Sequence, residues 1–246
     1  MTDNRKILLA LQYWEGDRRK AAETARFMAD IEPAHSELAD FLFVARSDAK
    51  MQEPADIQHI SRKFNVHQHK VRAAGTGHPW GCWVLWFETL RWLWDWKKAN
   101  RMPNYKAMLT FEADCVPLTK TWIRELSEEW DRVNRLYGKV NIMGSETWDF
   151  WDHVNGNLFV GGNFDFLDFI LRGVTLTGCP ENRGWDCYLF PTFVRWGSAN
   201  TVTMLNVCGK RSVEKDCLEK SIQRGIRFIH GVKDDSLFSQ ARAALL

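Results

Sequence analysis

The sequence has no apolar run of the roughly 20 residues that a transmembrane helix needs, although 45% of its 246 residues are hydrophobic. The charged N-terminus carries only a short apolar stretch and no small-residue cleavage pattern, so it is not typical of a signal peptide. We therefore expect a cytoplasmic protein that has no membrane partner.

The six cysteines include no CxxC pair, the spacing that is typical of zinc sites. They are Cys82, Cys115, Cys179, Cys187, Cys208 and Cys217. Thiols scattered in this way are typical of a protein in a reducing compartment, with the thiols spread through the core. A zinc site is therefore disfavoured.

The net charge is small, at +2, and the sequence contains no repeats, linkers or low-complexity segments. This charge gives no sign of a nucleic-acid binder, but it leaves room for a local basic patch. The length allows one large α/β domain or two small ones. The unusual feature is the number of tryptophans, 13, which either fill the core or stack on the rings of sugars or bases.

Short apolar segments alternate with amphipathic segments through the first 143 residues. We expect strands at 7–11, 41–45, 66–72, 105–111 and 140–143, and helices at 18–29, 54–64, 82–98 and 121–137. In the less regular second half we expect strands at 154–162, 201–207 and 226–229, and helices at 163–172, 185–196 and 212–224. Continuous apolar strands between helices predict an α/β fold with a parallel sheet covered on both faces.

Two features of the expected helices concern single side chains. Asp17 directly precedes the helix at 18–29 and is its expected N-cap. The helix at 82–98 carries a stripe of aromatic and leucine side chains that should face the core. Trp92 and Trp96 lie on a different face of this helix, and we expect them to be exposed.

Two carboxylates, Glu112 and Asp114, follow directly after the expected strand at 105–111. Ligands of open α/β sheets bind beyond the carboxyl ends of the strands, and a buried unpaired carboxylate costs several kcal/mol. A divalent cation would satisfy both carboxylates, whereas a helix cap by Asp114 or a salt bridge to an arginine are the alternatives. The late segment 230–233 favours the cation, because its imidazole can bind a transition metal and its lysine can pair with phosphate.

Four segments, in the same order along the chain, resemble motifs of the GT-A fold glycosyltransferases. Glu112–Asp114 resembles their Asp-x-Asp motif, with Glu at the first position, which leaves open whether this side chain contacts metal or ribose. His153–Phe159 resembles the strand on the acceptor side, and Gly184–Asp186 resembles the segment that supplies a base in inverting members. His230–Lys233 resembles the C-terminal His-Gly-x-Lys element.

The resemblance implies a single GT-A domain over residues 1–246, with a Rossmann-like, mixed and mostly parallel sheet flanked by helices. Residues 1–143 would form the nucleotide-sugar-binding half. Residues 144–246 would form the acceptor half and supply the C-terminal metal and phosphate element. The implied activity is transfer of a sugar from a nucleotide-sugar, most often a UDP-sugar, to a hydroxyl acceptor, with Mn2+ or Mg2+ as the cofactor.

The resemblance and the strand positions together assign roles to single residues. Asp114, His230 and Glu112 would hold the metal, with Glu112 also a candidate for the ribose, and Lys233 would pair with the diphosphate. The ends of the first two strands and the glycine-rich loop 75–81, at a helix N-terminus, should also bind the nucleotide-sugar. The residues expected there are Tyr13, Trp14, Arg46, Asp48, Gly77 and Trp80.

Asp186 is the candidate general base if the reaction inverts the anomeric centre, because Trp185 beside it could lower the local polarity. In a retaining enzyme Asp186 would orient the acceptor instead. A plain role at a helix start, in which Asp186 accepts backbone amides, is the third possibility. Acceptor binding is expected from Trp148, Trp151, Asn155 and Trp185.

The acceptor is either a saccharide or a DNA base. The aromatic and acidic segment 145–153 could stack on a ring of either kind, and a base flipped out of DNA needs an aromatic slot. Two groups of cations are candidate phosphate contacts. The first group is Arg62, Lys63, Lys70 and Arg72, and the second is Arg91, Lys97, Lys98, Arg101 and Lys106.

The small size, the tryptophan content and the loop 75–81 also resemble phage-type GT-A proteins, some relatives of which modify hydroxymethylated pyrimidines in DNA. A phage protein would act in the cytoplasm of the host cell. We therefore expect a DNA acceptor with hydroxymethylated pyrimidine bases. The alternatives are a glycosyltransferase for a bacterial surface saccharide and a non-catalytic module that binds sugar-nucleotides or nucleic acid.

Overall fold

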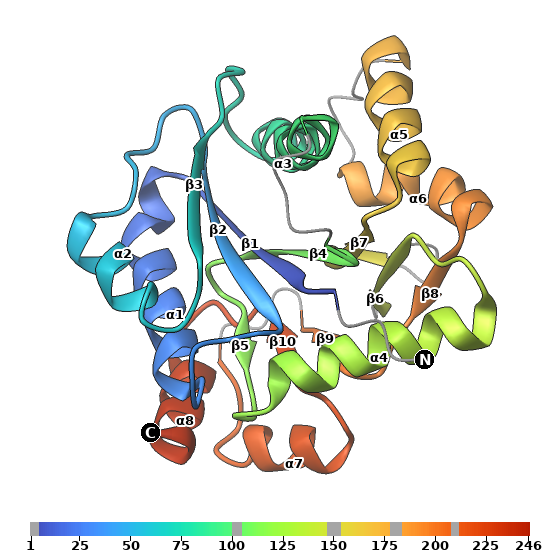
Figure 1. Ribbon diagram of the computed structural model, residues 1–246. Coiled ribbons are helices and arrows are strands. Elements are labelled where there is room, and N and C mark those ends of the chain that lie inside the picture. The colour runs from blue at the N-terminus through green and yellow to red at the C-terminus, as the bar shows by residue number, and fades with distance from the viewer. Residues whose placement is uncertain (1–4, 100–104, 147–153, 178–183, 208–211) are drawn as a thin grey trace.

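The structure is a computed structural model, and it describes residues 5–99, 105–146, 154–177, 184–207 and 212–246. A seven-stranded sheet with the order β3-β2-β1-β4-β7-β6-β8 forms its centre (Figure 1). These strands are β1 (Ile7–Tyr13), β2 (Ala39–Ala45), β3 (Val66–Lys70), β4 (Ala107–Glu112), β6 (Ile142–Glu146), β7 (Val154–Gly161) and β8 (Ser198–Asn200). The four strands from β3 to β4 are parallel, and β7 runs antiparallel to both of its neighbours.

A second, three-stranded sheet has the order β5-β10-β9. Its strands are β5 (Val116–Pro117), β9 (Met204–Asn206) and β10 (Phe228–His230). The strand β10 pairs antiparallel with β5 and parallel with β9. Because β5 follows β4 after a short turn, this small sheet brings the late chain next to the end of β4.

Helices cover both faces of the large sheet (Figure 1). They are α1 (Arg18–Ile31), α2 (Pro54–Ile60), α3 (Trp80–Lys98), α4 (Trp122–Tyr137), α5 (Phe164–Thr177), α6 (Trp185–Trp196), α7 (Cys217–Gln223) and α8 (Ser236–Leu245), with a short 3-10 turn η1 (Glu15–Asp17) before α1. None of the helices in the described ranges combines the length and the hydropathy that crossing a bilayer requires.

The alternation of side chains along β1 divides the interior into two cores. Ile7, Leu9 and Leu11 point into one core, which α1, α4, α8 and the small sheet complete. Leu8 and Ala10 point into the other core, which α3, α5 and α6 complete. Both faces of β1 are therefore buried, which explains its continuous apolar sequence.

The expected order of strands and helices through β7 is confirmed, with ends that differ by a few residues. The sequence patterns did not predict β5, β8 and α8, which are short or lie in the irregular second half. The expectation that Trp92 is exposed is wrong. It is 9% exposed and packs its ring against Trp96, His67 and His69, because the edge strand β3 lies beside this face of α3.

Candidate active site

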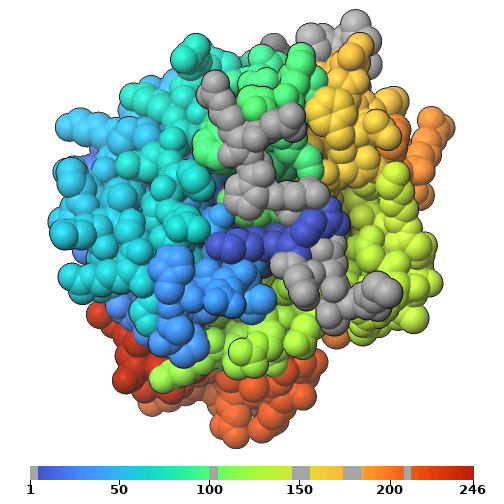
Figure 2. Space-filling view, viewed as in Figure 1, coloured from blue at the N-terminus to red at the C-terminus, as the bar shows by residue number. Residues whose placement is uncertain are grey.

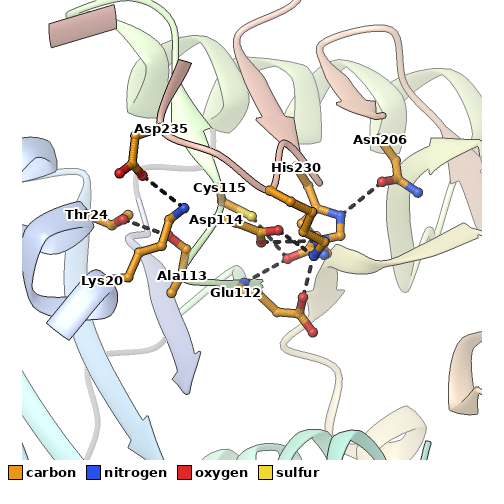
Figure 3. Close-up of polar contacts among 11 residues, drawn as sticks. Lys20, Thr24, Glu112, Ala113, Asp114, Cys115, Asn206, His230 and Asp235 are labelled. Atoms are coloured by element: carbon orange, nitrogen blue, oxygen red, sulfur yellow. Dashed lines mark hydrogen bonds and ion pairs between the residues drawn. The ribbon is translucent and has the colours of Figure 1, made fainter. Parts of the chain in front are cut away.

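Three possible metal ligands meet at the end of β4. The imidazole Nε2 of His230 lies 3.2 Å from Oε2 of Glu112 and 3.3 Å from Oδ1 of Asp114. One ligand atom from each of these residues falls within 4.8 Å of the others (Figure 3). The Nζ atom of Lys233 lies 2.8 Å from the other oxygen of Asp114. The expected convergence of residues 112–114 with 230–233 is therefore present.

The turn after β4 fixes the two carboxylates. The backbone N–H of Glu112 donates to Oδ1 of Asn157 on β7, at 2.8 Å, and the N–H of Cys115 donates to the carbonyl of Glu112, at 3.2 Å. From the other side, the hydroxyl of Thr24 on α1 donates to the carbonyl of Ala113, at 2.7 Å. Two neighbouring elements thus hold this turn, and it presents Glu112 and Asp114 toward His230.

The small sheet places the imidazole. Ile229 on β10 pairs with Val116 on β5, so the next residue, His230, lies beside the turn that carries Asp114. The Nδ1 atom of His230 lies 3.0 Å from Oδ1 of Asn206 on β9. An amide oxygen can only accept a hydrogen bond, so Nδ1 carries the hydrogen and the neutral ring presents the lone pair of Nε2 to the carboxylates.

Asp114 and His230 shift each other's pKa. Burial by itself lowers the pKa of His230, but the close contacts with Asp114 and Glu112 and their negative charges outweigh burial and raise it to about 9. Burial raises the pKa of Asp114, but His230 and Lys233 outweigh it and hold that pKa well below its usual value. Without a metal ion, a protonated imidazole thus balances the acidic cluster.

The residues fit a divalent cation. Oδ1 of Asp114 is buried and makes no hydrogen bond of good geometry to any described residue, which is costly unless a cation approaches it. Two carboxylates and one neutral imidazole are a suitable set for Mn2+, and carboxylates alone would suit Mg2+. Asp114, Glu112 and His230 would hold the cation, with neutral Nε2 as the imidazole ligand.

A third carboxylate, Asp17, lies within electrostatic range of this cluster. Burial raises the pKa of Asp17, and the negative charges of Asp114 and Glu112 raise it further. Asp17 occupies the expected N-cap position of α1, but its side chain makes no capping hydrogen bond to this helix. Its place directly after β1 could have suggested a position near the site, because β1 and β4 are parallel neighbours in the sheet.

The ends of β1 and β2 carry a partly exposed group of three side chains. The guanidinium of Arg46 lies 5.4 Å from the ring centroid of Trp14, and Trp14 is 46% exposed. Two hydrogen bonds, of 2.7 and 2.6 Å, join Arg46 to Asp48. A Cβ atom on Gly81, at the start of α3, would lie 2.9 Å from Nη1 of Arg46, so the glycine allows this close approach.

The loop before α3 lies beside these strand ends. Gly77 has a φ of 72°, a conformation that favours glycine, and Trp80 is 43% exposed. Cys82, in the first turn of α3, connects this loop electrostatically to the carboxylates. Burial raises the pKa of Cys82 to about 11, and the charges of Glu112 and Asp186 contribute to the rise.

Tyr13 does not lie where the sequence placed it. Its ring is 1% exposed and packs edge-on against Phe43, and its hydroxyl donates to the carbonyl of Lys50, at 3.0 Å. Burial raises the pKa of this hydroxyl to about 12. The buried ring offers no face to a ligand, so the expected contact between Tyr13 and the base or ribose is a wrong prediction.

Asp186 and Trp185 begin α6 and lie against β7. The carboxylate of Asp186 accepts the N–H of Gly156, at 3.1 Å, and that of Cys187, at 3.0 Å. The ring of Trp185 is 5% exposed and stacks on Trp86, with centroids 3.8 Å apart. The expected stacking of Trp185 on an acceptor is therefore wrong, because its ring lies in the core.

Three other expected acceptor residues have no described side chain. Trp148 and Trp151 lie outside the described residues, and Asn155 is described only as part of β7. In their place the structure adds two asparagines that the analysis of the sequence missed, Asn157 and Asn206. Asn157 follows Asn155 by two residues on the same strand, β7.

Comparisons with known proteins agree with this architecture. No family model matches the chain, and no curated protein matches it. Among solved structures, the galactosyltransferase LgtC, in complex with donor and acceptor sugar analogues, has a TM-score of 0.55 and 8% identity over 97% of this chain and 96% of its own. A glycosyltransferase involved in glycosylation of the major capsid of PBCV-1 has a TM-score of 0.50 and 10% identity over 97% of this chain and 98% of its own.

A third structure holds a nucleotide-sugar and a metal ion. The mannosyltransferase PcManGT from Pyrobaculum calidifontis, in complex with GDP-Man and Mn2+, has a TM-score of 0.50 and 10% identity over 81% of this chain and 55% of its own. Identities this low establish the fold alone. The expected GT-A fold, with its mixed and mostly parallel sheet flanked by helices, is confirmed.

Proposed function

We propose that this protein is a metal-dependent glycosyltransferase that moves a sugar from a nucleotide-sugar, a UDP-sugar by preference, to a hydroxyl acceptor. The observation that carries this proposal is the convergence of Glu112, Asp114 and His230, from segments more than 100 residues apart, on one point beyond the strand ends. The likeness of the fold to glycosyltransferases that bind sugar donors supports it.

Side chains of this protein would supply most of the contacts that bind the donor. Asp114, His230 and Glu112 would hold Mn2+ or Mg2+, which when bound neutralises charge on the departing diphosphate. Lys233, whose side chain is 57% exposed, can turn from Asp114 to a phosphate oxygen once a cation compensates that carboxylate.

The base and ribose would bind at the strand ends. Trp14 and Trp80 offer partly exposed aromatic faces, and Asp48 offers carboxylate oxygens that can accept from a ribose hydroxyl or a base N–H. The backbone at Gly77 would lie close to the donor. Arg46 would fix the orientation of Asp48 through its two hydrogen bonds.

We assign the proton-accepting role in an inverting reaction to Asp186. Its hydrogen bonds to the amides of Gly156 and Cys187 hold the carboxylate in one orientation, which general base catalysis requires. Its charge and that of Glu112 both act on Cys82, so the two carboxylates lie near the same first turn of α3. In a retaining reaction the same fixed carboxylate would orient the acceptor.

The acceptor that we propose is a hydroxymethylated pyrimidine base in DNA. Lys70 and Arg72 support it, because Lys70 pairs in register with Ala45 at the ends of β3 and β2, on the same sheet edge as the donor residues. Both side chains are exposed and could contact backbone phosphates. Arg62 and Lys63 precede β3 and belong to the opposite edge, so the expected basic group is divided between the two edges.

A panel of labelled nucleotide-sugars with Mn2+, offered to hydroxymethylated DNA, plain DNA and a bacterial surface saccharide, tests the proposal by mass spectrometry. The expected result is a hexose mass on hydroxymethylated DNA alone. Transfer only to the saccharide would replace the DNA acceptor and keep the enzyme. No transfer to any acceptor and no hydrolysis of any donor, despite tight donor binding, would identify a non-catalytic binding module.

A further inference from the structure

A cavity of about 440 Å3 lies at the opposite edge of the large sheet from the candidate active site. It lies at the start of β4, at the end of β7 and at the connection between α4 and β6. Lys106, which lines it, directly precedes β4, whereas Glu112 ends this strand. Six residues of extended strand separate the two sites by roughly 20 Å, so the cavity is no part of the donor site.

The lining of this cavity is cationic. Four of its residues are Arg5, Lys106, Arg135 and Lys139, and its one carboxylate is Asp131. Asp131 is already engaged, since it lies 2.8 Å from Nζ of Lys106, whose side chain is 2% exposed. No carboxylate among the lining residues therefore remains to balance Arg135 and Lys139, which are exposed at the end of α4 and in the loop after it.

The pKa of a neighbouring lysine shows that positive charges lie close together at this edge of the sheet. Lys97 donates from Nζ to the carbonyl of Gly162, at 2.5 Å, and Gly162 also lines the cavity. Burial lowers the pKa of Lys97, and the positive charge of Arg5 lowers it further. An anion bound in the cavity would relieve this repulsion.

A buried donor without an acceptor lies in the same wall. The Nδ2 atom of Asn163 is buried and has no hydrogen-bond partner in the described part of the chain. The other end of this amide is in use, because its Oδ1 accepts the N–H of Asp165 in the first turn of α5, at 3.1 Å. The orientation of Asn163 is thus fixed. Its Nδ2 atom is itself closed off from solvent, so this amide makes the wall polar but does not reach into the open part of the cavity.

The molecule in Figure 2 is seen from a side on which the dark-blue start of the described chain and the yellow-green region of α4 are both exposed.

A volume of about 440 Å3 lies within the range of small-molecule sites and exceeds what a single inorganic anion needs. An excess of lysine and arginine matches phosphoryl oxygens, which accept several charge-assisted hydrogen bonds.

We propose that this cavity, lined by Arg5, Lys106, Arg135, Lys139 and Asn163, is a second ligand site that binds a phosphorylated small molecule of sugar-phosphate size. The site is independent of the proposed glycosyl transfer. Its ligand is held by the two exposed cations at the rim, Arg135 and Lys139.

The test is isothermal titration calorimetry of the full chain with glucose 1-phosphate, at low salt and in the presence of EDTA so that the donor site holds no cation. The expected result is binding of one equivalent, which weakens as salt is added. The variant Asp114→Asn, which alters the candidate metal site, should bind the probe as the unchanged protein does. Absence of binding at low salt, or its loss in Asp114→Asn, would overturn the proposal.

Two variants locate the ligand. Arg135→Gln/Lys139→Gln should weaken binding roughly tenfold or more, since it removes two charge-assisted contacts. Lys120→Gln/Arg124→Gln removes the same charge at and near the start of α4. It should change the affinity less than twofold, because salt screens the interaction between these distant charges and the ligand. If Arg135→Gln/Lys139→Gln lowered only thermal stability and left binding unchanged, these cations would stabilise the C-terminal end of α4 and would not bind the ligand. The proposal would then be wrong.

Asn163→Asp gives an independent readout. The carboxylate keeps an oxygen that can accept the N–H of Asp165, so the start of α5 is preserved. It places a negative charge in the wall of the cavity, and it should weaken binding of glucose 1-phosphate about tenfold or more. Unchanged affinity in Asn163→Asp would show that the probe binds outside this cavity and would overturn the proposal.

Discussion

Strand β4 ends at Glu112 on one edge of the large sheet and begins beside Lys106 on the other, and the two edges collect side chains of opposite charge. At the acidic edge the buried atom without a hydrogen bond is an acceptor, Oδ1 of Asp114. At the basic edge it is a donor, Nδ2 of Asn163.

This comparison distinguishes charged side chains that stabilise the fold from charged side chains that are available to bind a ligand. Lys106 and Asp131 are both largely buried and pair with each other at 2.8 Å, so they need nothing more. Asp114 also has a cationic partner on one oxygen, Lys233, yet its other oxygen is left unsatisfied. An unsatisfied buried atom next to an excess of one charge is therefore a better sign of a ligand site than charge density alone.

The largest expected effect is that of Asp114→Asn. It should lower the rate of sugar transfer about a thousandfold, because it removes a metal ligand whose cation stabilises the leaving diphosphate by several kcal/mol. The measurement is kcat/KM with saturating Mn2+. Asp234→Asn, in the segment between β10 and α8, is the control, since it keeps an oxygen for the hydrogen bond to Ser236. Equal rates in the two variants would remove Asp114 from the site.

At the basic edge, Asp131→Asn should damage stability and leave metal binding intact. It leaves the ammonium of Lys106 buried without its partner, which should lower the free energy of unfolding by about 3 kcal/mol. Urea unfolding measures the change. Asp216→Asn is the control, because its partner Lys220 is exposed and such pairs contribute little. A loss as small as that of the control would contradict the structural role of the pair.

Asn206→Ala should weaken Mn2+ binding by about 10-fold to 100-fold, the usual effect of losing a group that orients a ligand histidine. Asn206→Asp keeps an acceptor for Nδ1 of His230 and should restore the affinity. Calorimetric titration with Mn2+ distinguishes the variants. If Asn206→Asp bound as weakly as Asn206→Ala, the loss would reflect packing and not orientation of the ring.

The pH dependence of metal binding should follow His230. With a pKa of about 9 the free imidazole is protonated at neutral pH, so each bound cation must displace one proton. Affinity for Mn2+ should rise about tenfold per pH unit below 9 and level off above it. Titrations in buffers of different ionisation enthalpy measure the released proton. A flat profile between pH 7 and 9 would exclude a shared imidazole.

Without metal, the same group links stability to pH with a definite sign. The folded pKa of about 9 lies above the ordinary value of 6.5, so protonation of His230 stabilises the folded state. This contribution is fully present below about pH 6.5 and is lost as the pH rises through 9. The metal-free protein should therefore lose stability over this interval.

The sequence was sufficient to predict the elements that carry strong periodic signals. The continuous apolar segments of β1, β2 and β4 and the amphipathic α4 are set by local composition, and so is the position of the two carboxylates after β4. The chemistry of residues 230–233 suggested a partner for these carboxylates, and the family resemblance supported it, but no local pattern states which distant segments meet.

The remaining parts depend on tertiary contacts that local composition does not encode. Tyr13 resembles a strand-end ligand residue in sequence, yet the neighbouring Phe43 and Lys50 bury its ring and bind its hydroxyl. β5 and β8 have only two and three residues and form because a partner strand is present. Asn206 and Asn163 acquire their roles from segments far away in the chain.

The most direct test of the central claim is pulsed electron paramagnetic resonance of Mn2+ bound to protein with 15N-labelled histidine. The account predicts one bound Mn2+ whose spectrum shows coupling to a histidine nitrogen, with this coupling absent in His230→Ala. Stoichiometric Mn2+ binding without any histidine coupling, or coupling that persists in His230→Ala, would contradict a cation shared by Asp114 and His230.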